Sequence, residues 1–146
     1  MFVDGDTDAL IAGQPTVGVV SGDDHLVAWK QDADFLYAQV GFAADPVERW
    51  RESIAFDGPV YAGVMVLASA AMARRLRSSA SDLPIPDAVI DGLERDPRYG
   101  VDLACDLVAE LAANGVVEGV HLVPVRRFRE VAARLEAAGF ARRRPR

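Results

Sequence analysis

The sequence has almost none of the residues that build covalent or all-cysteine metal frameworks. Its single cysteine, Cys105, excludes an internal disulfide framework and any metal site made only of cysteines. No run of residues approaches the ~18–20 apolar residues of a membrane span. The first residues lack the positive and apolar regions of a secretory signal. These absences predict a cytoplasmic protein.

Sequence motifs of the common catalytic classes are also missing. There is no dinucleotide fingerprint, phosphate loop, nucleophile elbow or zinc-type spacing. Asp102, Asp106 and Glu110 recur every four residues, which predicts a solvated acidic helix face rather than a metal site. We therefore predict no metal and assign no catalytic residue from motifs.

A net charge of −6 disfavours nucleic acid as a partner. The exception is the basic C-terminal tail at residues 142–146, which is interpreted either as a solvated terminus or as a contact for phosphates or acidic partners. With 146 residues and 51% hydrophobic composition, the chain is expected to form one globular domain over residues 1–146. Its core is predicted at about residues 16–138, with a basic tail at 139–146.

Short apolar runs alternate with amphipathic stretches along the chain. Strands are predicted at residues 16–20, 35–40, 60–66 and 119–123. Helices are predicted at about residues 24–31, 45–56, 69–77, 85–93, 100–114 and 126–138. Continuous apolar strands separated by helices favour an α/β fold with a parallel sheet. Periodicity leaves open a small doubly wound sheet or half of a (β/α)₈ barrel.

Several single residues carry specific structural expectations. Asp45 is predicted to cap the helix that follows it, and Gly115 to end the helix of residues 100–114. Cys105 falls on the apolar stripe of that helix and is expected to be buried packing. In the last helix, Phe128 is expected to point inward with Val131, Ala132 and Leu135.

Four segments, in order, resemble a known family. Residues 30–42 are similar to "K-x-x-A-G-A-D-F-x-x-T-Q-x-x-F", and residues 59–66 to the strand "P-I-x-P-G-I-x-P". Residues 83–86 with Val89 and Leu93 resemble an "I-P" helix, and residues 100–121 resemble a run ending in "G-V-x-G-x-H". From about residue 16 to 138 the chain thus resembles the C-terminal half of the methylenetetrahydrofolate reductase family.

The resemblance implies both an architecture and a chemistry. The expected fold is a parallel four-stranded half-barrel, equivalent to the second half of a TIM (β/α)₈ barrel. The implied function is an FAD-linked oxidoreductase of one-carbon folate metabolism, or a subunit of one. The alternative is a non-catalytic small-ligand binding or regulatory module that has lost the flavin site.

The sequence departs from the family pattern near the flavin. Residues 20–22 stand where the family has a Tyr-Pro-Glu-type motif, and its long loop is cut to residues 23–25. His25 is the candidate replacement for a flavin-side histidine. The family's first four strands, with its catalytic glutamate, have no counterpart in the resemblance. These departures favour the non-catalytic alternative.

The resemblance also suggests ligand-binding residues. Gln39, at the end of a strand, matches a glutamine that contacts pterin and flavin in the family, and an amide suits the edge of a pterin ring. Arg127 matches an arginine able to hold a folate tail or phosphate. Asp91 and Leu93 stand at folate-side positions. Each also has a purely structural interpretation, and His121 is expected to be a core histidine.

A half-barrel is expected to need a partner. Residues 16–20 and 119–123 would be exposed sheet edges. The barrel-facing residues would come from an apolar set: Val17, Val19, Leu36, Ala38, Val60, Val64 and Leu122. The predicted partner is a second copy or a separately encoded N-terminal half-barrel. Alternatively, residues 1–15 or the helix pair within residues 69–93 would cover the open face; the first segment is short and mostly polar, so the helix pair is the better candidate.

Overall fold

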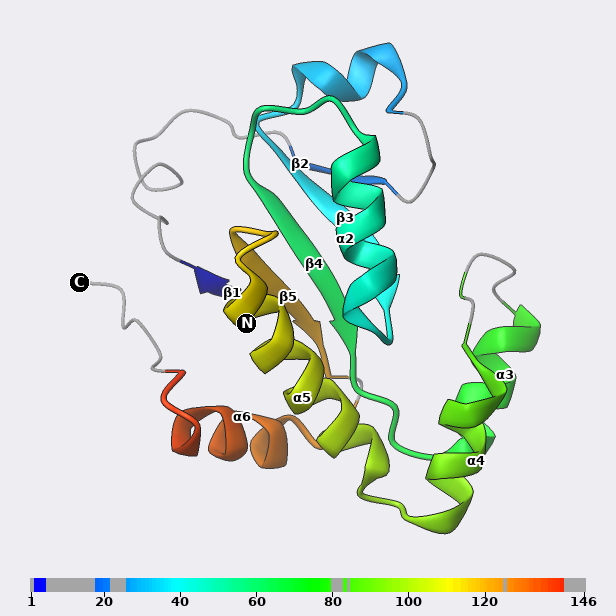
Figure 1. The fold of residues 1–146 in the computed structure, drawn as a ribbon. Coiled ribbons are helices and arrows are strands. Elements are labelled where there is room, and N and C mark those ends of the chain that lie inside the picture. The colour runs from blue at the N-terminus through cyan, green and yellow to red at the C-terminus, as the bar shows by residue number, and fades with distance from the viewer. Residues whose placement is uncertain are drawn as a thin grey trace.

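A five-stranded sheet with helices on one face forms the centre of the fold (Figure 1). The computed structural model describes residues 2–4, 18–21, 26–79, 83, 85–124 and 126–140. The strands are β1 (Phe2–Asp4), β2 (Gly18–Ser21), β3 (Phe35–Gly41), β4 (Val60–Met65) and β5 (Gly119–Val123). The helices are η1 (Ala28–Asp32), α2 (Ala44–Ser53), α3 (Ala70–Ser79), α4 (Asp87–Arg95), α5 (Tyr99–Asn114) and α6 (Phe128–Ala137).

The sheet is parallel except at one edge. Its order is β1-β5-β4-β3-β2, and the pairs β2–β3, β3–β4 and β4–β5 are all parallel. Successive parallel strands joined by helical connections confirm the predicted α/β class.

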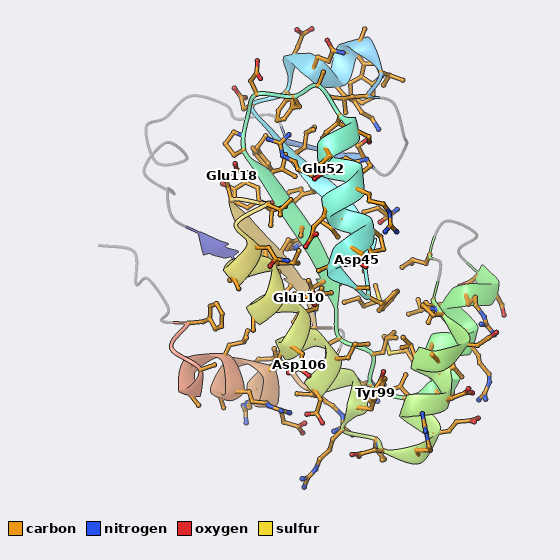
Figure 2. All side chains as sticks on the ribbon, viewed as in Figure 1. Asp45, Glu52, Tyr99, Asp106, Glu110 and Glu118 are labelled. Atoms are coloured by element: carbon orange, nitrogen blue, oxygen red, sulfur yellow. The ribbon has the colours of Figure 1, made fainter. Side chains whose placement is uncertain are left out.

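Glu118 fixes where β4 and β5 begin to pair. Its backbone N–H donates to the Val60 carbonyl at 2.9 Å. Its carboxylate accepts the Val60 N–H at 2.6 Å. Figure 2 shows Glu118 at the end of β5 that lies opposite the strand's exit toward α6. The side chain thus satisfies a strand-end amide that would otherwise have no ladder partner.

The main core lies between the sheet and its helices. In Figure 1, α2 and α5 lie across one face of the sheet, and α6 lies beside α5. Alternate strand residues point into this layer and are buried, as period-two geometry requires. The main cluster contains the strand residues Ala62, Val64, Val120 and Leu122 and also Val66, which follows β4. They pack with α-helical residues such as Val47, Val101, Val108, Leu111, Val131 and Leu135.

This packing corrects the expected barrel-facing set. Leu36 and Val60 pack with Ile54 and Phe56, which follow α2, while Val64 and Leu122 belong to the main cluster under the helices. Ala38 is buried on the same side of β3 as Leu36, two residues away. The small aliphatic side chains therefore face the helices, because that layer needs close strand-to-helix contact. Val17 lies outside the described residues, and the Val19 side chain is likewise not described.

The predicted outer edge at residues 119–123 is also wrong. β1 pairs antiparallel with β5, with Val3 opposite Val120 and Asp4 opposite Gly119. The sequence signal was weak because β1 has only three residues. The described strands at the two outer positions of the sheet are therefore β1 and β2.

The segment after β2 is not the predicted α-helix. Within the described part of residues 24–31, Leu26 and Val27 are outside any helix, and η1 is a short 3₁₀ helix. No residue of η1 is buried, and its first residue has no side-chain cap. A helix needs a buried stripe or a cap to offset its ordering cost, and this segment has neither.

Of the two helix ends predicted from single residues, the one at Gly115 is confirmed and the one at Asp45 is wrong. Gly115 ends α5 in the left-handed conformation at φ 62°, and its N–H donates to the Leu111 carbonyl. Asp45 is not a cap: Ala43 precedes α2 in extended conformation, and Asp45 lies in the first turn. In this position the negative charge of the Asp45 carboxylate is stabilised by the positive end of the helix dipole.

A second apolar cluster joins the α3–α4 pair to the ends of two strands. Phe42 and Leu67 pack with Ile85, Ile90 and Leu93 of this pair's region. Val40 and Met65, near the ends of β3 and β4, pack against the same cluster. Figure 1 shows α3 and α4 beyond that end of the sheet rather than across its open face.

Core packing under α5 is expected to dominate stability. Leu111 is 0% exposed in the main cluster, so Leu111→Ala should lower the free energy of unfolding in urea by about 3–5 kcal/mol. Val27→Ala is the control, because Val27 is 45% exposed and should cost less than about 0.5 kcal/mol. Similar losses for the two variants would contradict this core assignment.

Candidate functional site

The parallel strands gather the predicted ligand-binding residues at one end of the sheet. Gln39 lies near the carboxyl end of β3, and Arg127 directly precedes α6, which follows β5. α4, with Asp91 and Leu93, packs in the cluster that touches the ends of β3 and β4. The carboxyl ends of parallel strands are where (β/α) folds build their sites. His25 lies outside the described residues.

Gln39 occupies an irregularity in the sheet. Ala38 pairs with Ala62, but Gly41 pairs with Val64, so β3 contains one more residue than β4 in this interval. Such a bulge changes the direction of the side chains within it.

Gly63 makes room for this bulge. A Cβ at Gly63 would lie 2.9 Å from the Ala38 carbonyl oxygen and 3.1 Å from the Val40 Cα. Real Cβ atoms do not approach backbone so closely, so a glycine is required at this position.

The Gln39 amide is already partly engaged. Its Oε1 accepts the Val40 N–H at 2.9 Å, which satisfies an amide released from the ladder by the bulge. A carboxamide has two donors on Nε2 besides this acceptor. This hydrogen bond therefore orients the Gln39 side chain by its oxygen.

Arg127 has an unusual backbone conformation. Among the described residues it is the one non-glycine residue with positive φ, at φ 59° and ψ 21°. Its carbonyl accepts the N–H groups of Glu130 and Val131, and its guanidinium pairs with the Glu130 carboxylate at 3.2 Å. This conformation costs roughly 1–3 kcal/mol in a non-glycine residue and is typical of functional sites.

The two α4 residues differ in their environments. Leu93 is buried in the second apolar cluster, whereas Asp91 is exposed and its carbonyl accepts from Arg95. Their contact with a ligand stays a prediction. Leu93 belongs to the apolar cluster against which Val40 and Met65, near the ends of β3 and β4, are packed.

The sheet face opposite the helices carries an aromatic cluster that the sequence patterns did not identify. Tyr37 contacts the rings of Phe35, Tyr61 and His121, with ring centroids 5.1, 5.9 and 4.9 Å away. Tyr61 and Tyr37 pair across β3 and β4. The available signal was the alternation of these rings with the aliphatic residues of the same strands.

Burial keeps the polar members of this cluster neutral. It lowers the pKa of the His121 imidazole and raises the pKa of the Tyr37 hydroxyl. Both shifts favour the uncharged form.

A mostly apolar cavity of about 420 Å³ lies beside α6. Leu122, Pro124 and Val131 line it, and so does Phe128, which is 58% exposed. The expectation that Phe128 points inward is therefore wrong, because Phe128 is the first residue of α6 and stays mostly exposed. The predicted packing of Val131 and Leu135 is confirmed.

The acidic residues of α5 are paired with a neighbouring helix or exposed. Asp102 pairs with Arg134 of α6, while Asp106 and Glu110 are exposed on α5 (Figure 2). No metal-binding group of His, Cys, Asp or Glu occurs in the described part of the chain. Cys105 is buried as predicted, and burial raises the pKa of its thiol.

Comparison with known families now identifies the kinship of the chain. The family model for methylenetetrahydrofolate reductase matches residues 25–139. The chain belongs to the methylenetetrahydrofolate reductase family. This match confirms the resemblance and relates the chain to folate-linked oxidoreductases. No curated protein sequence matches the chain significantly. Within the described ranges, no helix is long and apolar enough to cross a membrane.

The bulge predicts the effect of filling Gly63. Gly63→Ala should lower the free energy of unfolding by about 1–3 kcal/mol, because the new methyl meets strand backbone that cannot rotate away. Gly41→Ala is the matched control, since its nearest contact would be an ordinary 3.5 Å to Val47. Urea denaturation of both variants measures the difference. Equal stabilities would refute the close approach at Gly63.

The lowered pKa of His121 predicts a pH dependence of stability. The unfolded chain takes up a proton near the ordinary histidine pKa, while the folded chain resists it. The folded state should therefore lose stability as the pH falls below about 6.5 toward the lower pKa of the folded protein.

His121→Gln should flatten this slope, because glutamine does not titrate. The matched control is His25→Gln, which removes the other histidine and should leave the His121 contribution intact. Urea unfolding at several pH values between 5 and 8 measures both slopes. A His121→Gln slope identical to that of the unaltered chain would count against the burial effect.

Proposed function

We propose that this chain is a methylenetetrahydrofolate-reductase-like protein of one-carbon folate metabolism that binds a reduced folate at the carboxyl ends of β3, β4 and β5. The observation that carries the proposal is Gln39 in its bulge at the end of β3, within the family match. In this proposal the pterin edge lies against the Gln39 amide. Arg127 holds the carboxylates of the folate tail.

The local geometry supports this assignment of roles. The Gln39 oxygen is held by the Val40 N–H, so the amide nitrogen is oriented before a ligand arrives. A side chain fixed in this way loses little entropy on binding. Arg127 already faces a carboxylate, that of Glu130, in a partly exposed ion pair. A folate carboxylate would exchange with Glu130 for the same guanidinium.

The half-barrel assignment belongs to the same proposal. The parallel pairs β2–β3, β3–β4 and β4–β5, with α2, α5 and α6 on one face, support equivalence to four consecutive (β/α) units. We further propose a partner that covers the aromatic face: a second copy, or a separately encoded N-terminal half-barrel.

The flavin is the less well supported part of the family chemistry. FAD has a dianionic pyrophosphate and a large planar ring, which require several cations or backbone amides together with a cradle. Among the described residues at the strand ends, Gln39 and Arg127 are the groups matched to the family pattern, and Arg127 is paired with Glu130. These residues alone do not fit FAD, and no hydride step is derived for this chain.

The second candidate function is therefore a binding or regulatory module without flavin. It is favoured by the engaged oxygen of Gln39 and by the short segment at residues 23–25, which replaces the long loop of the family pattern. In this proposal both candidates bind a folate-type ligand, so the presence or absence of bound flavin is what distinguishes them.

Flavin content is expected to decide between the two candidates. An FAD-linked oxidoreductase should be purified yellow, with visible flavin absorbance near one equivalent per chain. Colourless protein that takes up no FAD in equilibrium dialysis would exclude the FAD-linked oxidoreductase and favour the binding or regulatory module. Folate binding is measured separately, so a negative flavin result does not decide it.

Substitutions at the strand ends test the folate site itself. Gln39→Leu should weaken 5-methyltetrahydrofolate binding about tenfold in calorimetric titration, because one pterin hydrogen bond is lost. Arg127→Ala should weaken it about tenfold or more through loss of the charged contact. Arg129→Ala is the matched control on the same helix, since Arg129 lies over the Phe128 ring. Equal affinity in all three variants would refute the site.

A further inference from the structure

The edge of β5 is poorly protected by its own residues. The strand runs Gly119–Val123 and contains no carboxylate, lysine, arginine or proline. Its one titratable group, His121, has a pKa lowered by burial. Uncharged edge strands of this length readily pair with strands of other molecules. The fold therefore needs something that covers this edge.

β1 covers it with the first residues of the chain. Phe2 pairs with His121, Val3 with Val120 and Asp4 with Gly119. The direction is antiparallel, although the other three ladders are parallel. An antiparallel strand can be added without the helical crossover that each parallel strand requires. A short N-terminal segment is thus sufficient to complete the ladder.

The new edge differs from the one that it replaces. β1 is three residues long, against five for β5, and it includes Asp4. Short length and a charge on the edge strand are two devices that discourage pairing between molecules.

We propose that β1 is a capping strand that prevents β5 from pairing with β5 of a second copy of this chain. A second copy is the relevant partner because two β5 strands pair antiparallel about a two-fold axis, and each offers the same uncharged edge. The inference depends on the β1–β5 ladder and is independent of folate or flavin binding.

The experiment removes the cap in two ways. Val3→Pro eliminates a backbone N–H in the middle of β1 and should prevent the strand from pairing. Deletion of residues 2–4 removes the strand completely. Val3→Thr is the matched control, because it keeps the backbone N–H and a β-branched side chain. Light scattering after size exclusion gives the mass of each variant at micromolar concentration.

The expected result is a doubled mass for the proline and deletion variants, while the threonine variant has the mass of the unaltered chain. Unchanged masses for folded proline and deletion variants would overturn the proposal. Amide exchange of the unaltered chain, resolved by NMR, provides a second test if a variant fails to fold. Slow exchange of the β5 amides that face β1 supports the cap. Exchange of those amides at the rate of an unpaired strand edge would overturn it.

Discussion

One-sided burial of a parallel sheet is the constraint on which the rest of this structure depends. The helices cover one face, so each strand must send its small aliphatic residues to that side. Val64 and Leu122 illustrate the result, because both lie under helices within the main cluster. The opposite face then receives the alternate residues, including Tyr37, Tyr61 and His121. Strand periodicity divides each strand into two faces, and the position of the helices decides which of them becomes the core.

The candidate site results from a local departure from that regularity. One extra residue in β3 turns the strand at Gln39, and Gly63 on β4 leaves the space that the turn requires. Neither residue explains the geometry alone. A glycine in the middle of a strand and an amide at the end of its neighbour form one unit, and the unit lies at the sheet end where family chemistry is expected.

Sequence reasoning predicted the α/β class, the parallel pairing and most element bounds, because strong apolar periodicity marks them. It failed where the outcome depends on tertiary context. The strand at residues 2–4 is too short to produce a pattern. The described members of the set expected to face a barrel interior lie under the helices instead, because alternation shows two faces without showing which one the helices cover. The Gln39 bulge depends on register between two strands, which no single segment encodes.

The hydrogen bonds between Glu118 and Val60 make one end of the sheet different from the other. This contact spans 58 residues of sequence and lies directly before the first pair of the β4–β5 ladder, at the end opposite the strand exits. Loops after the strands, including the helix pair α3–α4, lie between the joined points or beyond them. Neither Glu118 nor Val60 belongs to those segments, so this contact does not depend on their length or composition. A fold anchored in this way allows ligand specificity to diverge while the scaffold keeps its geometry.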